Sequence, residues 1–339
     1  MDRDQQGETL TRPAPDARAA ITPAQPAKKS FIRVVEIWHP TSDGKQLQFL
    51  DGYYGPLEEF RAASETMRFG FDEGLPGKAW ASGHPIILKQ FADSYFKRTE
   101  AAQAAGLTCG VAMPVMAGDD LKAVVVLFCG DDEAHVGAIE LWHNDPDRSF
   151  EMRLADGYYG AADMFAFNSK YTKFPRGFGL PGRVWKANMP LIVKDLYRSQ
   201  SFLRWKEAVD IGINRGLGIP YPHASGQIWV MTFLSAFDTP IARRFEIWLP
   251  NEAGTALLFH SGDCDQNTQL AADYQSVAIG KGEGTIGEVW GSGVPALRTN
   301  IADDRSPAGR SAAAAALKAM VAMPIMDERG VKAVVVWYF

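Results

Sequence analysis

One short motif occurs three times in this chain of 339 residues, at a constant interval. The copies read DEGLPGKAW at residues 72–80, GFGLPGRVW at 177–185 and GEGTIGEVW at 282–290, so that their tryptophans are 105 residues apart. Self-similarity at a fixed period indicates that one supersecondary unit is used repeatedly. We therefore predict three copies of a unit of about a hundred residues.

The segments around the motif repeat in the same order. In the first copy, β-branched and aromatic runs at 31–39 and 46–55 predict a hairpin. Apolar residues at helical spacing predict a helix over 57–69. The glycine-rich motif then reads as a turn, followed by a strand at 84–89, a helix at 94–106 and a closing hairpin at 108–129. Pro114, Pro220 and Pro324 keep this β-β-α-β-α-β-β pattern in register.

This period sets the expected domain boundaries. Residues 1–29 are rich in Pro, Ala and Gln and poor in large apolar side chains, which predicts a disordered tail. Domains are expected at 30–132 and 133–238, with a divergent third at 239–339. Because the links between copies are short, we expect units packed edge to edge like beads. No further catalytic or DNA-binding region is expected after the third copy.

Composition excludes several classes of protein. The net charge is −5 with no basic block, which disfavours a nucleic-acid partner. No apolar run is long enough to cross a bilayer, and the start of the chain lacks the apolar segment of a secretory signal. Three cysteines with no close pair disfavour a disulfide framework or a zinc site. A reducing cytoplasm is the expected location.

The repeat resembles a GAF domain. The resemblance rests on G-L-P-G-x-x-W, on the F-x-R step that opens the second helix, on the Ala-rich helix that ends in Gly106 or Gly212, and on the proline of the closing hairpin. It covers residues 31 to 339. The third copy is divergent, since GTIGEVW lacks the proline and DCDQ stands in place of DGYYG.

The resemblance implies an α+β fold, similar to that of PAS domains. Each unit would have a central antiparallel sheet flanked by helices, and loops and short helices would roof one face over a small-molecule pocket. Family members bind cyclic nucleotides, tetrapyrroles, haem, amino acids or small ions, and many serve only as dimerisation modules. The helices that usually begin and end such units are absent or very short here. Sequence alone identifies no cofactor.

Several residues are candidates for ligand binding in the first and second copies. Glu36, Glu140 and Glu246 precede a tryptophan by two positions, so each Glu–Trp pair shares one face of its strand. His39 and His143 end the opposite face and could titrate or bind an anion. An arginine near the start of the second helix, Arg98, Arg204 or Arg310, could clamp a carboxylate or phosphate. The remaining candidates are Trp80, His84, Tyr53, Trp185 and Tyr158.

Each candidate also has a structural interpretation. The histidines could cap strand ends, the arginines could form ordinary ion pairs, and the tyrosines could pack in turns. Backbone N–H groups of the glycine-rich motif could hold an anion, as glycine loops do elsewhere. Alternatively, the glycines let the loop close over the sheet while Trp80, Trp185 and Trp290 fill the core.

No catalytic set recurs in the chain, so we predict that it is not an enzyme and binds no metal. The cysteine of bilin-binding GAF domains and the NKFDE motif of cyclic-nucleotide GAF domains are both missing. Three functions remain open. The first is a sensor of a small molecule or anion that acts through a signalling partner or by homo-oligomerisation. The second is a ligand-free structural or dimerisation module, and the third is redox catalysis by Cys109.

Overall fold

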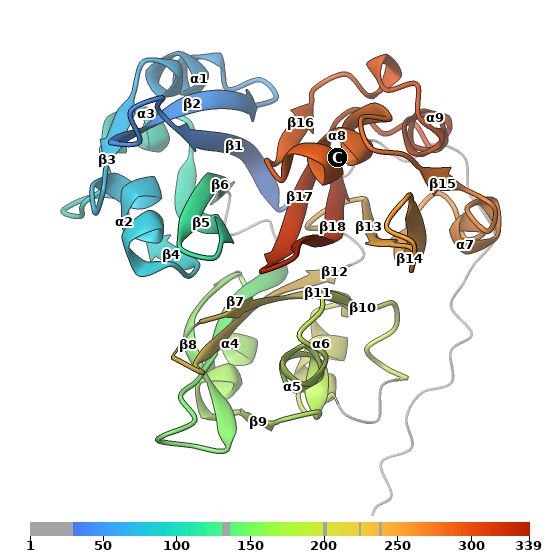
Figure 1. Ribbon diagram of the computed structural model, residues 1–339. Helices are drawn as coiled ribbons and strands as arrows, with labels where there is room; N and C mark the ends of the chain where they lie inside the picture. Colours follow the sequence, from blue (N-terminus) through green and yellow to red (C-terminus); the bar gives the residue numbers. More distant parts are fainter. Residues whose placement is uncertain (1–29, 131–135, 199–201, 224, 237–238) are drawn as a thin grey trace, which may run out of the picture.

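The computed structural model describes residues 30–130, 136–198, 202–223, 225–236 and 239–339 (Figure 1). The tail predicted over 1–29 and the boundary predicted at 132–133 lie outside the described residues. Residues 30–130, 136–236 and 239–339, named here the first, second and third units, each form a six-stranded antiparallel sheet with helices on one side. The predicted α+β fold and its threefold repetition are therefore confirmed.

The elements of each unit follow the same order along the chain. Those of the first unit are β1 (Ile32–Pro40), β2 (Gln46–Tyr53), α1 (Glu58–Glu65), β3 (Arg68–Gly70), α2 (Gly74–Ser82), β4 (Ile86–Lys89), α3 (Thr99–Ala104), β5 (Leu107–Ala117) and β6 (Asp120–Gly130). Those of the second are β7 (Val136–Asn144), β8 (Glu151–Gly160), α4 (Asp163–Tyr171), β9 (Lys173–Pro175), α5 (Gly179–Ala187), β10 (Leu191–Val193), α6 (Trp205–Asp210), β11 (Ile213–Pro222) and β12 (Ile228–Ala236).

The third unit adds one short helix to this plan. Its elements are β13 (Arg244–Pro250), β14 (Leu257–Cys264), α7 (Leu270–Asp273), β15 (Ala278–Ile279), α8 (Gly284–Ser292), β16 (Ala296–Arg298), the 3₁₀ helix η1 (Ile301–Asp303), α9 (Pro307–Ala314), β17 (Met320–Asp327) and β18 (Gly330–Tyr338). The strand order β3-β2-β1-β6-β5-β4 recurs as β9-β8-β7-β12-β11-β10 and as β15-β14-β13-β18-β17-β16.

The repeated glycine-rich motif is a helix and not the predicted turn. In α2, α5 and α8 the motif supplies the first turn, where a proline is tolerated because its missing N–H has no partner within the helix anyway. Each of these helices ends at a residue in the left-handed conformation, Gly83, Asn188 or Gly293. The short strands β3, β9 and β15, which the sequence analysis did not predict, precede the motif.

The second glycine of the motif is required by close packing. A Cβ added at Gly77, Gly182 or Gly287 would lie 2.1, 2.1 or 2.2 Å from the carbonyl oxygen of Gly70, Pro175 or Gly280, respectively. Real Cβ atoms essentially never approach backbone that closely. The motif therefore recurs because each helix crosses the preceding backbone at van der Waals contact.

We expect Gly287→Ala to lower the free energy of unfolding by about 2 kcal/mol or more, since the added methyl group collides with a carbonyl that cannot swing away. Gly291→Ala, in the same helix, is the matched control. Its Cβ would meet nothing closer than 3.8 Å, so the helix propensity of alanine leaves stability unchanged or slightly raised. Urea unfolding of both variants measures the difference, and equal losses would contradict this explanation of the motif.

Each sheet buries both of its faces. On the helix-covered face, three separate cores form around Trp38, Trp142 and Trp248. On the other face, side chains of all three sheets, among them Ile37 and Leu141, form one continuous core. Burial on both faces explains why central strands such as β6 read as nearly uninterrupted apolar runs.

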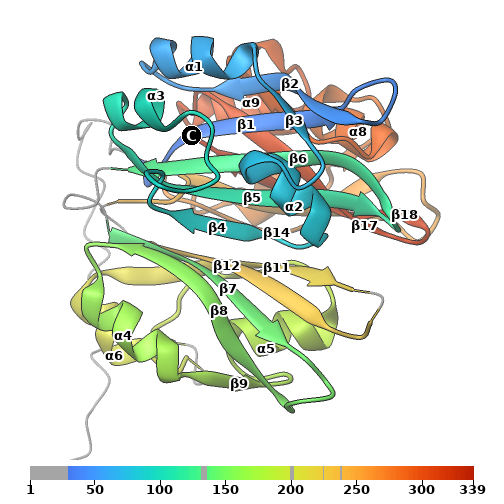
Figure 2. The same ribbon diagram turned by 90° about the vertical axis from the view of Figure 1, so that its left-hand side faces the viewer.

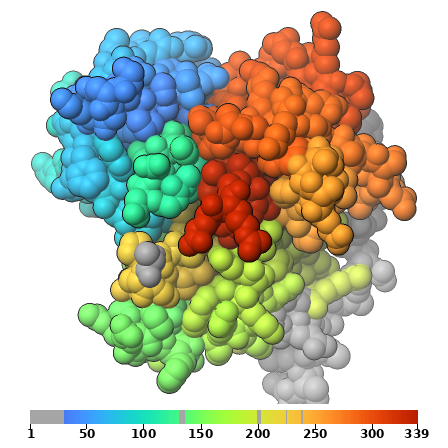
Figure 3. Space-filling view, in the orientation of Figure 1, coloured from blue at the N-terminus to red at the C-terminus, as the bar shows by residue number. Residues whose placement is uncertain are grey.

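The three units close into a ring. Strand β4 of the first unit lies beside β8 of the second, β10 beside β14 of the third, and β16 beside β2 of the first. Figure 2 shows the helices of the second unit on the side of its sheet that faces away from the other two units. In Figure 3 the β17–β18 hairpin, in red, lies where the units meet. The expected edge-to-edge beads are therefore wrong, because the sheets pack face against face over a shared core.

Different side chains join each pair of neighbours. Lys89 pairs with Asp156 between the first and second units, and Phe31 packs on Tyr158 with ring centroids 5.4 Å apart. The buried Arg215 binds Asp263 at 2.8 Å, and also Asp265, between the second and third. Tyr53 stacks on Phe339 at 5.8 Å between the third and first. Since these contacts differ, each unit has a defined neighbour on either side.

Candidate functional site

A glutamate lies at the centre of each helix-side core. Glu36, Glu140 and Glu246 are fully buried in the first strand of their units. Each carboxylate accepts a hydrogen bond from the indole Nε1 of the tryptophan two residues later, at 2.9, 3.0 and 2.9 Å. The predicted common face of each Glu–Trp pair is therefore confirmed.

In the first and second units, an arginine from the opposite side of the core pairs with this glutamate. Arg98 and Arg204 come just before α3 and α6, and both are buried. Both nitrogens of the Arg98 fork bind Glu36, at 2.5 and 2.9 Å. Arg204 binds both oxygens of Glu140 in the same way. This two-pronged geometry is the strongest that an arginine forms with a carboxylate.

Hydroxyl groups and aromatic rings complete these two networks. Ser64 of α1 and Ser169 of α4 each donate to their glutamate, at 2.8 and 3.0 Å. Tyr54 donates to Glu36 at 2.9 Å, and Thr232 to Glu140 at 3.2 Å. The guanidinium groups of Arg98 and Arg204 lie 4.7 and 4.4 Å from the ring centres of Phe60 and Phe165, where cation–π attraction offsets part of their desolvation.

The third unit builds its network with an arginine from a different strand. By the register of the closing-hairpin proline, the position of Arg98 and Arg204 is occupied by the buried Ala308. Arg244, two residues before Glu246 on β13, takes their place, where the second unit has Ala138. Arginine and alanine have thus exchanged positions between the second and third units. The prediction that Arg310 is the third-unit counterpart of Arg98 and Arg204 is wrong. Its side chain is exposed and binds the carbonyl of Arg305.

The third network is the weaker one. Arg244 approaches Glu246 at 3.4 Å through one nitrogen, with further contacts of 3.2–3.4 Å to Ser311 and Tyr274. Burial alone raises the pKa of Glu246, and Arg244 only partly offsets this effect. Burial also favours a higher pKa for Glu140. The charge and hydrogen bonds of Arg204 outweigh this effect and hold the pKa of Glu140 below its usual value. The same buried carboxyl thus has opposite pKa shifts in two units.

These networks occupy the space between sheet and helices where the resemblance implies a ligand pocket. In the first and second units, the arginine fork that could have clamped an anionic ligand is engaged by the chain's own glutamate. An amide of α4 also bonds to α6, from Asn168 to Glu207 at 2.7 Å. The ligand roles of Arg98 and Arg204 remain predictions.

The third unit has two surface hollows. One, of about 330 Å³, lies between α7 and α9 and is lined by residues that include Asn267, Tyr274, Arg310 and Ser311. The other, of about 310 Å³, lies beside the start of α8 and is lined mainly by charged residues, among them Glu288, Arg298 and Asp303. The helix α7, which borders the first hollow, has only four residues.

The glycine-rich motif of the third unit already has an anionic partner. The carboxylate of Asp304 accepts hydrogen bonds from the backbone N–H of Thr285, at 2.8 Å, and of Ser306, at 2.9 Å. Asp304 thereby occupies the start of α8, where the motif was predicted to be able to hold an anion. These bonds outweigh burial and lower the pKa of Asp304.

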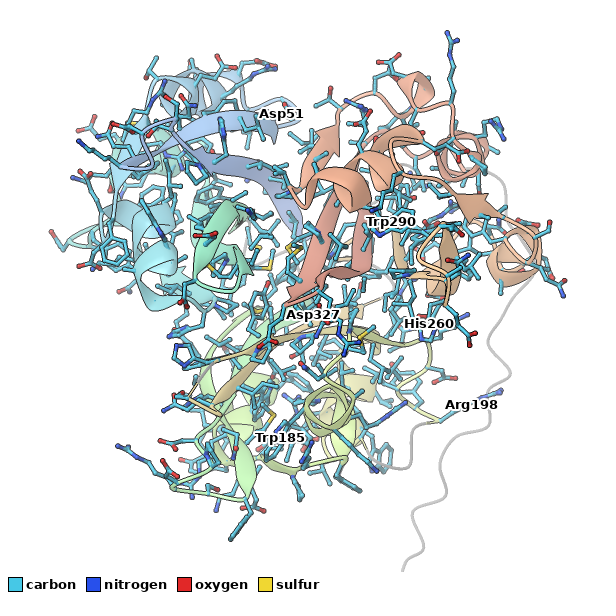
Figure 4. All side chains as sticks on the ribbon, viewed as in Figure 1. Asp51, Trp185, Arg198, His260, Trp290 and Asp327 are labelled. Carbon is cyan, nitrogen blue, oxygen red and sulfur yellow. The ribbon has the colours of Figure 1, made fainter. Side chains whose placement is uncertain are left out.

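The tryptophans of the motif are not the ones that bind the buried glutamates. Trp80 of α2 and Trp185 of α5 are half-buried and pack against the edges of the helix-side cores, where they also contact Phe71 and Arg176. Figure 4 shows Trp185 and Trp290 in different units, far apart. Trp290 is buried, but the fully buried tryptophans are Trp38, Trp142 and Trp248 of the first strands. Trp80 and Trp185 are only partly buried but pack against the helix-side cores, so the structural interpretation of the motif tryptophans holds for all three.

Five other predicted site residues belong to the face where the sheets meet. They are His39, Tyr53, His84, His143 and Tyr158. Tyr53 and Tyr158 pack against rings of neighbouring units, and Tyr158 also bonds to Thr108 at 3.2 Å. His39 is the second-last residue of β1, and burial and the nearby Arg68 lower its pKa. The candidate residues thus divide between the helix-side cores of two different units and the face where the sheets meet.

His84 and His143 meet at one tryptophan. The ring of Trp229 in β12 stacks with His84 of the first unit at 4.2 Å and with His143 of its own unit at 4.5 Å, while His223 lies edge-on at 6.0 Å. Burial lowers the pKa of His84, and the neighbouring His143 and His223 lower it further, against a hydrogen bond to the carbonyl of Pro85. Neutral His84 is therefore a contact between the first two units.

This pKa shift predicts acid sensitivity. A histidine with a lowered pKa contributes stability above its ordinary value of 6.5 that is lost as the pH falls toward the folded-state pKa. We expect His84→Gln to reduce the loss of melting temperature between pH 7.5 and 5.5. His260→Gln, at an exposed histidine of the third unit, is the control and should keep the wild-type difference. Unchanged acid sensitivity in His84→Gln would refute this assignment.

The three cysteines are buried, and two of them are neighbours. Cys109 and Cys129 lie opposite one another on β5 and β6, facing the core that the three sheets share. The two cysteines are 20 residues apart in the sequence, so no close pair is visible there, and strand pairing brings them together. Within the described residues, no group of three or more His, Cys, Asp and Glu side chains could hold a metal ion.

The buried networks around the three glutamates were not predicted from the sequence. The glutamates entered only as partners on a strand face, and Ser64, Ser169 and Arg244 were not predicted. The available signal was a charged residue in the middle of an apolar strand, repeated in all three units. A buried carboxylate needs a cationic or hydrogen-bonding partner, and that requirement could have directed attention to the arginines.

A comparison with protein families assigns the first unit. The GAF domain model matches residues 33–141, which span the first unit and reach into β7 of the second. The other two sheets repeat the strand order of this unit, which is consistent with three tandem GAF-like domains. No curated protein matches the sequence. Among the described helices, none combines the length and apolar character that crossing a bilayer requires.

Solved structures align with about one unit of the chain. The GAF domain of NLH2 from A. aeolicus is 18% identical, with a TM-score of 0.24, over 29% of this chain and 58% of that one. NreA from Staphylococcus aureus, mutated in its nitrate binding site, is 17% identical over 29% and 72%, with a TM-score of 0.24. Free methionine-R-sulfoxide reductase from Neisseria meningitidis is 18% identical over 31% and 53%, with a TM-score of 0.24. This chain thus spans less than three-fifths of the NLH2 structure.

Proposed function

We propose that this chain is a non-catalytic interaction module, in which three GAF-like domains form one platform that works through protein contacts without a bound ligand. The observation that carries this proposal is the filling of the helix-side cores in the first and second units. Their buried carboxylates are neutralised by Arg98 and Arg204, and aromatic rings pack around both ion pairs. Nothing in that arrangement calls for an exogenous ion.

Two further observations support the proposal. The continuous core fixes the three units relative to one another, as a platform for protein contacts requires. Cys109, the residue of the redox alternative, has no exposed surface in that core, so a substrate could not reach its thiol without separation of the sheets. Catalytic cysteines need an accessible site that favours the thiolate.

Native mass spectrometry of the purified protein tests the proposal. The expected mass is that of the bare chain or of whole-number multiples of it. We also expect no rise in melting temperature with nucleotides, amino acids or inorganic anions, since a ligand that binds only the folded state must stabilise it. A co-purifying small molecule, or a saturable rise in melting temperature, would overturn ligand independence.

The hollow between α7 and α9 favours a second candidate function, which is binding of a small molecule in the third unit. Its lining combines Arg310, Asn267 and the hydroxyl groups of Tyr274 and Ser311, a mixture suited to a small polar ligand. If a ligand raises the melting temperature, Ala314→Trp should abolish that rise because Ala314 lines the hollow. Ala313→Trp, at an exposed position of α9 that is not among the lining residues, should retain it.

A further inference from the structure

Large apolar side chains are exposed mainly on the second unit. Of the nine that the described residues expose, six belong to this unit. They are Phe150, Met164, Phe167, Tyr171, Phe178 and Leu203. Exposed apolar side chains that cluster on one element, unlike scattered ones, indicate a contact surface. The second unit is therefore where a protein contact is to be sought.

Three of these side chains form a stripe along α4. Met164, Phe167 and Tyr171 are 68%, 52% and 70% exposed, and their spacing of three and four residues places them on one face of the helix. The rings of Phe167 and Tyr171 are 5.2 Å apart. The helix buries its other face through Phe165 and Ser169, so the stripe contributes nothing to the core of its own unit.

The equivalent helix of the first unit lacks this stripe. Aligned on Ser64 and Ser169, which occupy the same place in their networks, the first unit has Glu59, Ala62 and the C-cap residue Thr66 where α4 has the three apolar residues. All three of these residues of the first unit are exposed. Since both helices make the same serine–glutamate contact beneath them, folding of the unit does not require an apolar outer face.

The charges beside the stripe are arranged for self-association. Asp163 and Lys170 are two helical turns apart, on the same flank of the stripe. Both are exposed, and neither forms an ion pair with another described residue. When two copies of a helix pack antiparallel about a two-fold axis, a given flank of one copy lies against the same flank of the other. The two flanks run in opposite directions along the contact. Asp163 of each copy then faces Lys170 of the other, and Phe167 lies near the axis.

We propose that α4 is the contact through which two copies of this chain form a two-fold symmetric dimer. A two-fold contact requires a surface that is complementary to itself, and the apolar stripe with one acid and one base on the same flank meets that requirement. This inference rests on the proposed function and identifies one protein contact of the platform. The helices of the second unit face away from the other units, so this dimer leaves the ring intact (Figure 2).

The expected dimer is weak. One helix face buries less than the roughly 800 Å² per partner of a standard stable interface, so dissociation at about micromolar concentrations is expected. Sedimentation equilibrium of the full chain between about 1 and 500 µM, where such complexes dissociate, should show the weight-average mass rising from one to two chain masses. A mass that stays at one chain throughout would overturn the proposal.

Two substitutions at equivalent positions test the surface. Phe167→Glu should raise the dissociation constant at least tenfold, because it places two like charges beside the symmetry axis. Ala62→Glu makes the same replacement at the exposed matching position of α1 and should leave the dissociation constant unchanged. Circular dichroism and the melting temperature verify that both variants fold. A dimer that withstands Phe167→Glu would place the contact elsewhere and refute this one.

Charge reversal tests the antiparallel orientation. Asp163→Lys and Lys170→Asp should each weaken the dimer, since like charges then meet across the axis. The double variant should recover most of the wild-type affinity, and high salt should reduce all of these differences. Additive weakening in the double variant would overturn the proposed orientation. If the protein stays monomeric and binds no ligand, only the proposed dimer is refuted. If it binds a ligand, the ligand-independent function proposed above is refuted.

Discussion

Replacing Arg204 with alanine is expected to lower the stability of the protein by about 3–5 kcal/mol, because removal of one partner leaves a buried charge without compensation. Glu140 has no exposed surface and would lose both bonds of the guanidinium fork. The packing of the guanidinium on Phe165 would also be lost. Urea unfolding followed by tryptophan fluorescence measures the change.

Arg198→Ala is the matched control. Arg198 belongs to the same unit and pairs with Asp195, but 70% of its side chain is exposed. Exposed ion pairs contribute about 0–1 kcal/mol, so this variant should unfold close to the wild-type midpoint. If both variants lost equal stability, the buried pair would not have the importance assigned to it.

The third unit suggests how the loss can be reversed. There the arginine comes from β13, at the position that Ala138 occupies in the second unit, and alanine occupies the position of Arg204. We expect Ala138→Arg, added to Arg204→Ala, to recover at least about 1 kcal/mol, since a second cation again reaches Glu140. Ala138→Arg alone should destabilise, because two guanidinium groups would then share one carboxylate. A double variant less stable than Arg204→Ala would refute the exchange.

Neutralising the buried glutamate should have unequal effects in two units. We expect Glu140→Gln to destabilise by about 3 kcal/mol or more, as for other broken buried pairs. Glu246→Gln should cost at least about 1–2 kcal/mol less, because burial already favours the uncharged form of Glu246 and raises its pKa. Both glutamines retain an oxygen that can accept from the nearby indole. Equal losses at pH 7 would contradict the difference between the two networks.

The opposite pKa shifts of Glu140 and Glu246 also predict how their contributions to stability change with pH. The pKa of Glu140 is lower in the folded chain than in the unfolded one, so its contribution is present above its ordinary value and is lost as the pH falls through the lowered pKa. The pKa of Glu246 is raised, so its contribution is present at low pH and is lost as the pH rises through the folded-state value. From pH 7 to 4, the penalty of Glu140→Gln should shrink relative to that of Glu246→Gln.

Several features of the fold follow from the sequence because they depend on local periodicity. The 105-residue interval gives the number of units, and strand alternation places Glu36 beside Trp38 on one face and Ile37 on the other. The glycine-rich motif suggests a turn because glycine and proline are unfavourable in the interior of a helix. Both are tolerated in a first helical turn, so only the structure could show the helix.

The sequence by itself determined three units through the 105-residue repeat, and a Glu–Trp pair on one strand face in every copy through strand alternation, while the resemblance to GAF domains implied the antiparallel α+β fold. Tertiary structure decided the rest. A long arginine side chain can reach the same carboxylate from either side of a core, so the sequence could not show that Arg244 replaces Arg204. Whether a sheet's second face meets water or another sheet depends on contacts between units, so only the structure could show the closed ring.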